Sequence, residues 1–412
     1  MFIPDDLIGE IFSGLPVKSI LRFRHVSKYC GNLVSDPDFV KFHLKRSSKR
    51  NPQFILKTDH TIKILCDSND SQVDEGFIPY SVCTLIQNPS FSIQVDPYFT
   101  VKNYEYRFIG SCHGFICFVG ENLTSDYYNF WLQLWNPATR TKSQKLGFIR
   151  VFHHHPNDGY YKFNFGYDNS TGTYKAVALR YNQRELRSNV RILSLGDNVW
   201  RDIGSFPVDP MYLNSAYQTC DVGVYFKSTI NWLAIQNHFW YDSNDINDIS
   251  VEQFVIVSLD LRTETYNQYL LPPDFDEVPP LAPIVSVLGD CLCFSYCYKE
   301  TDFVIWKMEE FGVEDSWTQF LKISYCSLQI DYDYSDEDTK YNFELVPLFL
   351  SKDGDTLVLK SNHEYQEILY NWRNNRVVRT NITARKKIMD DRTIDFVSCS
   401  ANGYFESLLS VI

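Results

Sequence analysis

The first 45 residues space their apolar positions as α-helices do. Between residues 7 and 15 the apolar side chains recur at intervals of three and four, which predicts one helix with a broad apolar stripe. Pro16 ends it, and a second short helix follows over residues 19–23. Ser27 is a suitable N-cap for a third helix, and residues 39–44 resume the pattern as a fourth. The chain therefore begins with a small helical domain.

Beyond residue 50 the pattern changes to short runs in which apolar and polar residues alternate, as in β-strands. Five segments join two such runs through a polar turn: Trp131–Leu146, Val190–Phe206, Phe254–Leu271, Phe303–Ile323 and Glu367–Ile382. Further strand pairs lie between them: Phe108–Val119, Phe163–Tyr181, Asp221–Ile235, Ile284–Cys297 and Leu345–Lys360. A unit of four strands thus recurs every 47 to 64 residues, counted between positions 135, 195, 259, 306 and 370.

A recurring four-strand unit of this length predicts a β-propeller. Five units are complete, and a sixth would be built from the two chain ends by strands at Phe54–Cys66, Val82–Leu85 and Ile394–Leu409. We therefore predict a mainly β fold, a propeller of about six blades behind a small α-helical domain. The predicted boundaries are residues 1–45 for the helical domain, 46–52 for a solvated linker and 53–412 for the propeller.

The helical domain is too small to cover all of its own apolar surface. Its apolar residues surround more than one helix face, so some should stay uncovered after the helices pack together. At about 1.5 to 3 kcal/mol for each buried side chain, three or four such residues would offset much of an association cost of about 4 to 15 kcal/mol. This surface predicts either a partner protein or a face that the β domain covers.

The charge is distributed unevenly between the two parts. Of 412 residues, 39 are Lys or Arg and 51 are Asp or Glu, which gives a net charge of −12. Residues 1–50 hold nine basic and five acidic residues, a net of +4, which leaves 30 basic and 46 acidic residues, a net of −16, for the remainder. So acidic a domain disfavours a nucleic-acid partner. The two parts are expected to meet different partners.

The cysteine count and the absence of apolar spans indicate a compartment. Nothing near the N-terminus resembles an export signal, and no apolar run approaches the roughly 18 residues of a membrane span. The eleven cysteines are an odd number, which favours reduced thiols over a disulfide framework. We therefore expect the cytoplasm or the nucleus and no membrane partner. The sequons at Asn69, Asn122, Asn169 and Asn381 are then chance matches.

One motif suggests a catalytic nucleophile. Residues 110–114 read Gly-Ser-Cys-His-Gly, which places Cys112 at the centre of a nucleophile elbow with His113 beside it. An elbow requires a helix after the turn, whereas residues 115–119 continue as a strand. Neighbouring side chains of a strand also point to opposite faces, which would separate the thiol from the imidazole. We interpret the motif as a hairpin turn and predict no catalytic residue.

Three clusters suggest metal sites, and each has a simpler interpretation. His153–His155 are consecutive, as in a solvated loop, whereas structural zinc needs four converging ligands. Cys291, Cys293 and Cys297 would share one strand face and pack as small apolar side chains. The acidic run Asp331–Asp338 lacks the Gly and Glu that a calcium loop needs at positions six and twelve. No phosphate-binding loop is present, so we predict neither a metal nor a cofactor.

Six short motifs follow one another through about the first 45 residues: Ile3–Ile8, Ile11–Phe12, Leu15–Ile20, Arg22–Arg24, Val26–Lys28 and Leu33–Phe39. In this order they resemble the F-box. This resemblance implies docking to a Skp-type adaptor, and through it to the cullin and RING subunits of an SCF-type ubiquitin ligase. The residues expected on the adaptor face are Pro4, Leu7, Ile8, Ile11, Leu15, Pro16, Leu21 and Val26. Where the F-box pattern has Trp, this chain has Cys30, which would weaken docking unless Tyr29 fills the gap.

The β segment is similar to the plant F-box-associated domain, which is similar to kelch propellers. The motifs that carry this similarity span about residues 105–270: Gly110–Phe115, Leu134–Arg140, Phe165–Asp168, Tyr174–Val177, Gly223–Tyr225, Asn231–Leu233 and Val257–Asp260. The similarity implies a non-catalytic receptor that recruits a target protein for ubiquitination and degradation. Two alternatives remain, an F-box-derived interaction module that docks weakly to the ligase and a propeller hydrolase or oxidase. The sequence does not indicate the target.

Overall fold

The computed structural model describes residues 5–50, 52–61, 73–94, 99–102, 106–124, 126–152, 158–182, 187–208, 223–236, 249–330, 343–361, 364, 366–387, 393–396 and 398–409. The chain forms two compact units. Residues 1–152 and 381–412 make up the first unit, and residues 153–380 the second. Among the described residues, no helix has both the length and the apolar character needed to cross a membrane.

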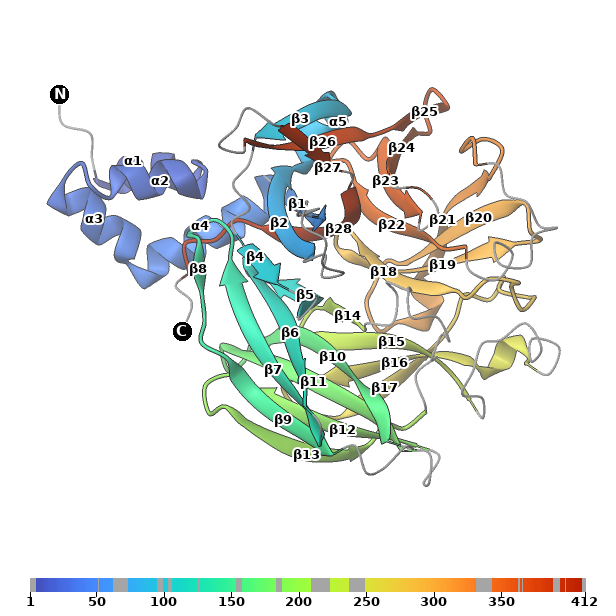
Figure 1. Cartoon of the computed structure of the whole chain (residues 1–412). Helices are drawn as coiled ribbons and strands as arrows, with labels where there is room; N and C mark the ends of the chain where they lie inside the picture. The colour runs from blue at the N-terminus through green and yellow to red at the C-terminus, as the bar shows by residue number, and fades with distance from the viewer. Residues whose placement is uncertain are drawn as a thin grey trace, which may run out of the picture. The chain divides into compact units, whose positions relative to one another are not determined.

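Four helices begin the first unit (Figure 1), and their bounds are α1 (Asp5–Ser13), α2 (Val17–Phe23), α3 (Lys28–Ser35) and α4 (Pro37–Arg50). The prediction of a helical N-terminal region is therefore confirmed. Ser27 caps α3 as expected, because its Oγ accepts a hydrogen bond from the backbone N–H of Cys30 at 3.1 Å.

The segment 46–52, predicted to be a linker, is mostly helical, because α4 continues to Arg50 and the first strand begins at Pro52. The extra turns of α4 are held from α1. Arg46 Nη2 lies 2.5 Å from a carboxylate oxygen of Glu10, and Arg46 Nη1 donates to Ser13 Oγ at 2.6 Å. The local structure of this segment thus differs from the solvated linker that its basic composition suggested. The domain boundaries themselves stay a prediction.

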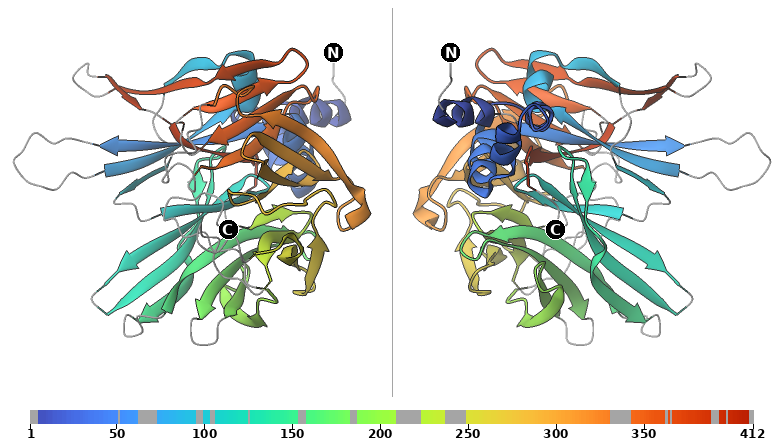
Figure 2. Two further views of the ribbon diagram at one scale, coloured as in Figure 1. Left: turned by 90° about the vertical axis from the view of Figure 1, so that its right-hand side faces the viewer. Right: turned by 90° about the vertical axis from the view of Figure 1, so that its left-hand side faces the viewer.

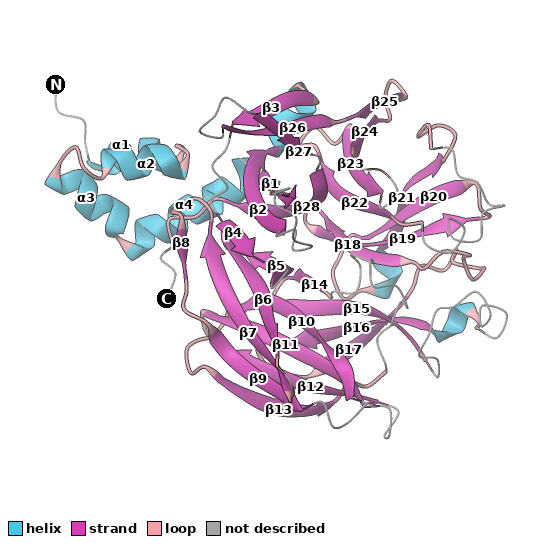
Figure 3. Cartoon of the chain, viewed as in Figure 1, coloured by secondary structure: helices cyan, strands magenta, loops and turns pink. Residues whose placement is uncertain are grey.

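Outside α1–α4, the regular elements of the described chain are strands, apart from one short helix and two single helical turns at Val251–Gln253 and Glu314–Ser316 (Figure 3). The first sheet joins the two ends of the chain in the order β28–β1–β2–β4, with β1 (Pro52–Thr61), β2 (Val73–Ser81), β4 (Phe99–Lys102) and β28 (Ser398–Phe405). The pairing of β1 with β28 confirms that a unit is built from both chain ends. Residues 62–66, also expected in its first strand, lie outside the described residues.

Two further sheets complete the first unit. One runs β5 (Tyr106–Cys112), β6 (Phe115–Leu123), β7 (Tyr127–Asn136) and β8 (Thr141–Lys142), and β9 (Leu146–Phe152) also pairs with β7. The other has three strands in the order β27–β26–β3, with β3 (Ser90–Gln94), β26 (Asn381–Lys387) and β27 (Thr393–Phe396). Here β26 runs parallel to β3.

The strand predicted at Val82–Leu85 is wrong, because this segment is the helix α5 (Val82–Gln87). The two side chains that it buries are Val82 and Leu85, which lie three residues apart and share a helix face but would lie on opposite faces of a strand. Ser81 caps the helix, since its Oγ accepts a hydrogen bond from the N–H of Thr84 at 3.3 Å. Both signals were present in the sequence.

The second unit contains four consecutive antiparallel sheets of four strands each (Figure 2, green to orange). The first sheet consists of β10 (Asp158–Asp168), β11 (Thr173–Asn182), β12 (Arg187–Ser194) and β13 (Val199–Ser205). The second consists of β14 (Val224–Phe226), β15 (Thr229–Ile235), β16 (Phe254–Asp260) and β17 (Tyr266–Leu270). The third sheet consists of β18 (Ile284–Leu288), β19 (Cys291–Tyr298), β20 (Asp302–Met308) and β21 (Trp317–Ser324). The fourth consists of β22 (Leu345–Leu350), β23 (Thr356–Ser361), β24 (Glu367–Asn371) and β25 (Arg376–Arg379). The predicted hairpins thus appear in order.

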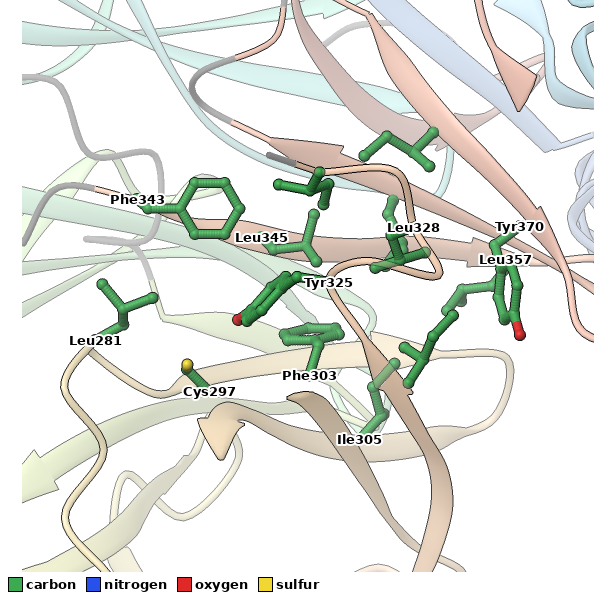
Figure 4. Packing of buried hydrophobic residues seen from close by; sticks show 14 of the residues in the cluster. Leu281, Cys297, Phe303, Ile305, Tyr325, Leu328, Phe343, Leu345, Leu357 and Tyr370 are labelled. Atoms are coloured by element: carbon green, nitrogen blue, oxygen red, sulfur yellow. The ribbon is translucent and has the colours of Figure 1, made fainter. Parts of the chain in front are cut away.

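Buried side chains fill the spaces between successive sheets of the second unit. Figure 4 shows one such cluster, between the sheets β18–β21 and β22–β25. There Phe303 and Ile305 of β20 meet Leu345 and Leu357 of the next sheet, and all four side chains are buried. Tyr325 belongs to the same cluster, which sheet-to-sheet packing of large side chains makes dry and dense. Because side chains of β19 contribute to two different core clusters, this strand is buried at six of its eight positions, more than a simple alternation of apolar and polar residues predicts.

Candidate functional site

The four N-terminal helices share one apolar core. Every helix contributes to it, and its buried members are Phe12, Val17, Ile20, Val34, Phe39, Val40 and Leu408. In α1 the side chains of Ile8 and Phe12 lie one turn apart and point to this core, and Leu15 joins them from the turn after the helix. The aromatic ring of Phe12 also stacks on that of Phe23, with 5.1 Å between centroids. The inward face of each helix is thereby used.

Several apolar side chains of the same helices remain exposed. Leu7 is 52% exposed, Ile11 is 56% exposed and Val26 is 70% exposed. Leu7 and Ile11 lie one turn apart on α1, each one residue before a core position, so they lie about 100° around the helix from the face that packs on the core. Among the predicted docking residues, Pro16 is also exposed, whereas Ile8, Leu15 and Leu21 are partly buried against the core. Pro4 lies outside the described residues.

The exposed apolar side chains have basic neighbours. Lys18, Arg22, Arg24 and Lys28 are all exposed on α2, on α3 or between them, and no acidic residue occurs between positions 11 and 35. Exposed cations on helices that also expose apolar side chains favour an acidic partner, because opposite charges attract each other over long range. The exposed surface made by Leu7, Ile11, Pro16 and Val26 is called the docking surface below.

A buried histidine positions the helix that carries the docking surface. His43 of α4 is only 1% exposed, and its Nε2 lies 2.9 Å from the carbonyl oxygen of Leu15. Burial lowers the pKa of His43, although the hydrogen bond to Leu15 opposes part of that shift. The imidazole is therefore neutral near pH 7 and donates its Nε2 proton to the end of α1. The α1–α2 corner is fixed by this bond.

The position at which the F-box pattern has Trp is partly buried. Cys30 of α3 packs against the helical core one turn before the buried Val34. Tyr29, on the neighbouring position, is 38% exposed. Its ring therefore keeps substantial solvent contact, and the core contact at this place comes from the small thiol of Cys30.

A feature that the sequence did not indicate is the attachment of the helices to the C-terminal segment, residues 406–409 (Figure 1). A carboxylate oxygen of Glu406 accepts a hydrogen bond at 3.2 Å from the backbone N–H of Val17, at the start of α2. Leu408 and Leu409 pack into the helical core. Burial raises the pKa of Glu406, while the bond from Val17 lowers it. No local pattern indicates this attachment, because Val17 and Glu406 are 389 residues apart in the sequence.

Asn136 holds the same C-terminal segment from the β side. Its Nδ2 donates to the carbonyl oxygens of Ser407 and Leu409, at 3.0 and 2.9 Å. Its Oδ1 accepts from the N–H of Ala138 at 3.0 Å, which closes the turn after β7. Its Oδ1 also accepts from the N–H of Thr139 at 3.3 Å, so the fully buried side chain bonds to four backbone groups. One residue thus joins a sheet, the chain end and the helices.

The Gly110–Gly114 motif forms a hairpin turn between β5 and β6, as predicted. Strand β6 begins at Phe115 directly after the turn, so the strand–turn–helix of a nucleophile elbow is not formed. Gly114 has a φ of +84°, and a Cβ there would lie 2.1 Å from Cβ of Ser407. The glycine is therefore required by close contact with the C-terminal segment. The buried Cys112 ends β5.

The three residue clusters that suggested metal sites lie partly inside and partly outside the described residues. No group of three or more potential ligands occurs in the described part of the chain. Cys293 and Cys297 of β19 are buried in a core cluster, as predicted, and burial raises the pKa of Cys293 to about 12, so its thiol stays protonated. Cys291 is only partly buried. His153–His155 and the acidic run Asp331–Asp338 lie outside the described residues.

Comparison with known families agrees with both parts of this architecture. Residues 2–42 match the family model of the F-box domain, and residues 52–411 match that of the F-box associated beta propeller domain. The chain therefore belongs to the family of F-box proteins with an F-box associated beta propeller domain. The predicted fold class, a mainly β propeller of about six blades behind a helical F-box, is confirmed, and the six described sheets of four or five strands are the blades.

Its relatives include plant F-box proteins. An F-box/kelch-repeat protein of Arabidopsis thaliana is 25% identical over 339 residues, which are 78% of this chain and 79% of the relative. The F-box protein CPR1 of the same plant is 25% identical over 385 residues, 88% of this chain and 80% of the relative. Among solved structures, the α-L-arabinofuranosidase of Fusarium graminearum aligns at 10% identity over 84% of this chain and 92% of its own, with a TM-score of 0.36. That structural similarity is too weak to carry an argument.

Proposed function

We propose that this F-box protein is the substrate-recognition subunit of an SCF-type ubiquitin ligase. Its docking surface would bind a Skp-type adaptor, and its propeller would bind a target protein. The observation that carries the proposal is the exposure of Leu7, Ile11 and Val26 on helices whose other faces already form a core. When a partner covers large apolar side chains that are exposed to this extent, their burial lowers the free energy of the complex.

Electrostatics support the same assignment of partners. Residues 1–50 carry a net charge of +4, and the basic side chains of α2 and α3 are exposed on the same helical domain as the docking surface. An acidic adaptor surface would complement them. The remainder of the chain, with its net charge of −16, would meet a different protein, the target.

The proposed mechanism is proximity and needs no catalytic group in this chain. A target held near the charged conjugating enzyme meets it at a high effective concentration, so lysines of the target react without a nucleophile from the receptor. The receptor must then be rigid and must bind at two places. The bonds from His43 to Leu15 and from Asn136 to the chain end provide that rigidity around the docking surface.

The decisive experiment measures adaptor binding by the double variant Leu7→Asp/Ile11→Asp. Both side chains are more than half exposed, so the substitutions should leave folding intact while placing two charges against an apolar partner. At 1.5 kcal/mol or more for each lost contact, affinity for a purified Skp-type adaptor should fall by about a hundredfold or more.

The matched control is Val199→Asp/Leu270→Asp, because these two side chains are 58% and 57% exposed and lie in the second unit. It should bind the adaptor as the unchanged protein does. Co-purification with adaptor and cullin from plant extract supplies the second measurement. If the docking variant binds the adaptor normally, or if the unchanged protein does not bind it, the proposed function is wrong.

A second candidate function follows from Cys30. If its small side chain leaves the adaptor contact too weak, the chain would act as an interaction module that binds its target without the ligase. Propeller binding would then persist while co-purification with cullin is lost. The comparison of Cys30 variants described in the Discussion separates the two functions.

A further inference from the structure

One face of the strands β6, β7 and β9 carries a groove that the docking surface does not use. The groove encloses about 340 Å³, and its lining side chains are Asn122, Asn129, Trp131, Lys145, Phe148 and Arg150. All of them belong to the first unit, and they come from the strands themselves and from the segment between β8 and β9.

The strand register places three polar side chains in a row across the groove. Asn122 of β6 pairs with Asn129 of β7, which in turn pairs with Arg150 of β9. Directly paired residues of antiparallel strands point to the same face, so the two amides and the guanidinium lie side by side. Arg150 Nε donates to Asn129 Oδ1 at 3.2 Å, which orients the amide group.

Aromatic pairs lie on both sides of this polar row. On one side the rings of Tyr127 and Phe152 are 6.0 Å apart, and on the other those of Trp131 and Phe148 are 6.4 Å apart. Gly120 allows the indole to lie against the sheet, because a Cβ at Gly120 would come within 2.4 Å of the Trp131 ring. Strand pairing and ring packing therefore build this surface before any ligand arrives.

Two cations of the groove are held by rings and not by carboxylates. Lys145 Nζ lies 3.6 Å from the centre of the Trp131 ring, and the Arg150 guanidinium carbon lies 4.3 Å from that of Tyr127. No ion pair of either side chain occurs with the carboxylates that the structure describes. In a region with a net charge of −16, two cations without a carboxylate partner are available to an anionic ligand.

The groove is bordered by exposed apolar surface. Phe148 is 61% exposed and Phe152 is 55% exposed, on alternate positions of β9 with Arg150 between them. Exposed aromatic rings beside available cations suit a ligand that carries both carboxylates and apolar side chains.

We propose that this groove binds an extended acidic peptide segment of a target protein, with apolar side chains between its carboxylates. The carboxylates pair with Lys145 and Arg150, the amides of Asn122 and Asn129 bond to the peptide backbone, and an apolar side chain covers Phe148. This role in target recruitment rests on the proposed function. A neutral oligosaccharide would leave both cations unused. A nucleic acid presents a continuous row of phosphates, which the two cations of the groove are too few to neutralise.

The test uses a fluorescein-labelled ten-residue peptide of alternating glutamate and leucine, and fluorescence anisotropy of the full chain without adaptor. A second peptide has glutamine in place of glutamate, and cellohexaose serves as the neutral carbohydrate. Lys145→Gln/Arg150→Gln should weaken binding of the acidic peptide at least tenfold. The matched control, Lys307→Gln/Lys322→Gln, removes two cations that lie over the rings of Phe320 and Tyr298, and should change binding less than twofold.

Phe148→Ala serves as an independent variant, because an exposed side chain contributes little to folding, and it should weaken binding at least fivefold. Equal loss in both cation pairs, equal binding of the glutamine peptide, or competition by cellohexaose would each overturn the proposal. Adaptor affinity of Lys145→Gln/Arg150→Gln should stay unchanged. The inference alone fails if the peptide does not bind while the adaptor does, whereas lost adaptor binding with retained peptide binding refutes only the proposed function.

Discussion

Asp168 shows how a buried charge is satisfied by its immediate neighbours. Its side chain is fully buried, and its oxygens accept from the N–H and Oγ of Ser170 at 2.9 and 2.6 Å and from Oγ1 of Thr171 at 2.8 Å. Lys175 Nζ lies 3.6 Å away. Burial by itself would raise the pKa of Asp168, but the bonds from Ser170 and Thr171 prevail and lower the pKa to about 2.

Asp168→Asn should therefore make stability less dependent on pH. The folded pKa lies below the ordinary 3.8, so the charge stabilises the fold above pH 4 and loses that effect as the pH falls toward 2. The stability difference between the unchanged protein and the variant should narrow by about 1 kcal/mol from pH 7 to pH 3. Urea denaturation at several pH values measures it. The exposed Asp315→Asn is the control, and a constant difference for Asp168→Asn would contradict the assignment.

Cys30→Trp should strengthen docking of the adaptor. The residue lies partly buried beside the helical core, so an indole there adds apolar area to the core and to its rim. We expect about tenfold tighter binding to a Skp-type adaptor, measured by calorimetry. Cys326→Trp, at an exposed cysteine of the second unit, should change nothing. Equal affinities of Cys30→Trp and the unchanged protein would mean that Cys30 does not limit docking.

At the scale of elements, hydrophobic periodicity and turn residues predict the hairpins, whose strands are close in sequence. They do not predict an element correctly where helical and strand signals compete, or where the paired strands are distant in sequence. In the five repeated units, runs of alternating apolar and polar residues are separated by polar turns, and this pattern predicts their hairpins. In Val82–Leu85 a strand was predicted because the apolar run is short, although the spacing of its buried residues is helical. The parallel pairing of β26 with β3 joins residues almost 300 apart, which no local pattern encodes.

The docking surface was predictable for the same local reason. Exposure of Leu7, Ile11 and Val26 follows from an apolar pattern too wide for one buried stripe. The sequence does not predict which apolar residues lie in the core and which at the surface, since Ile8, Leu15 and Leu21 are partly buried in contacts with other helices. The attachment of the helices to residues 406–409 could not be foreseen, because its partners are distant in sequence.

Asn136→Ala should loosen the turn after β7 together with the chain end. It removes two donors to carbonyl oxygens of residues 407 and 409 and leaves those buried acceptors unpaired. The expected loss of unfolding free energy is about 3 kcal/mol, measured by urea denaturation. Asn371→Ala is the control, because this residue takes the matching place at the end of β24 but is only partly buried, and about 1 kcal/mol is expected. Similar losses in both variants would contradict the bridging role.

On the scale of the whole molecule, the chain ends carry both the closure of the first unit and the support of the docking surface. β28 supplies the neighbour of β1, and the residues after it contact α2 and the helical core. The second unit takes no residue from beyond position 380. A change at the C-terminus should therefore act on adaptor binding through structure, without touching the exposed docking residues.

Truncation after residue 397 tests this. The shortened chain lacks β28 and residues 406–409, so β1 keeps only β2 as a neighbour and α2 loses the carboxylate that caps Val17. Because unpaired buried backbone groups on β1 and uncovered apolar core side chains are both costly, hydrogen exchange should become fast in α1–α4 and β1. Exchange in β14–β25 should stay slow, and adaptor affinity should fall at least tenfold. Removal of residues 410–412 alone is the control and should preserve slow exchange in α1–α4, whereas slow exchange there after the longer truncation would show that the helices stand without the chain end.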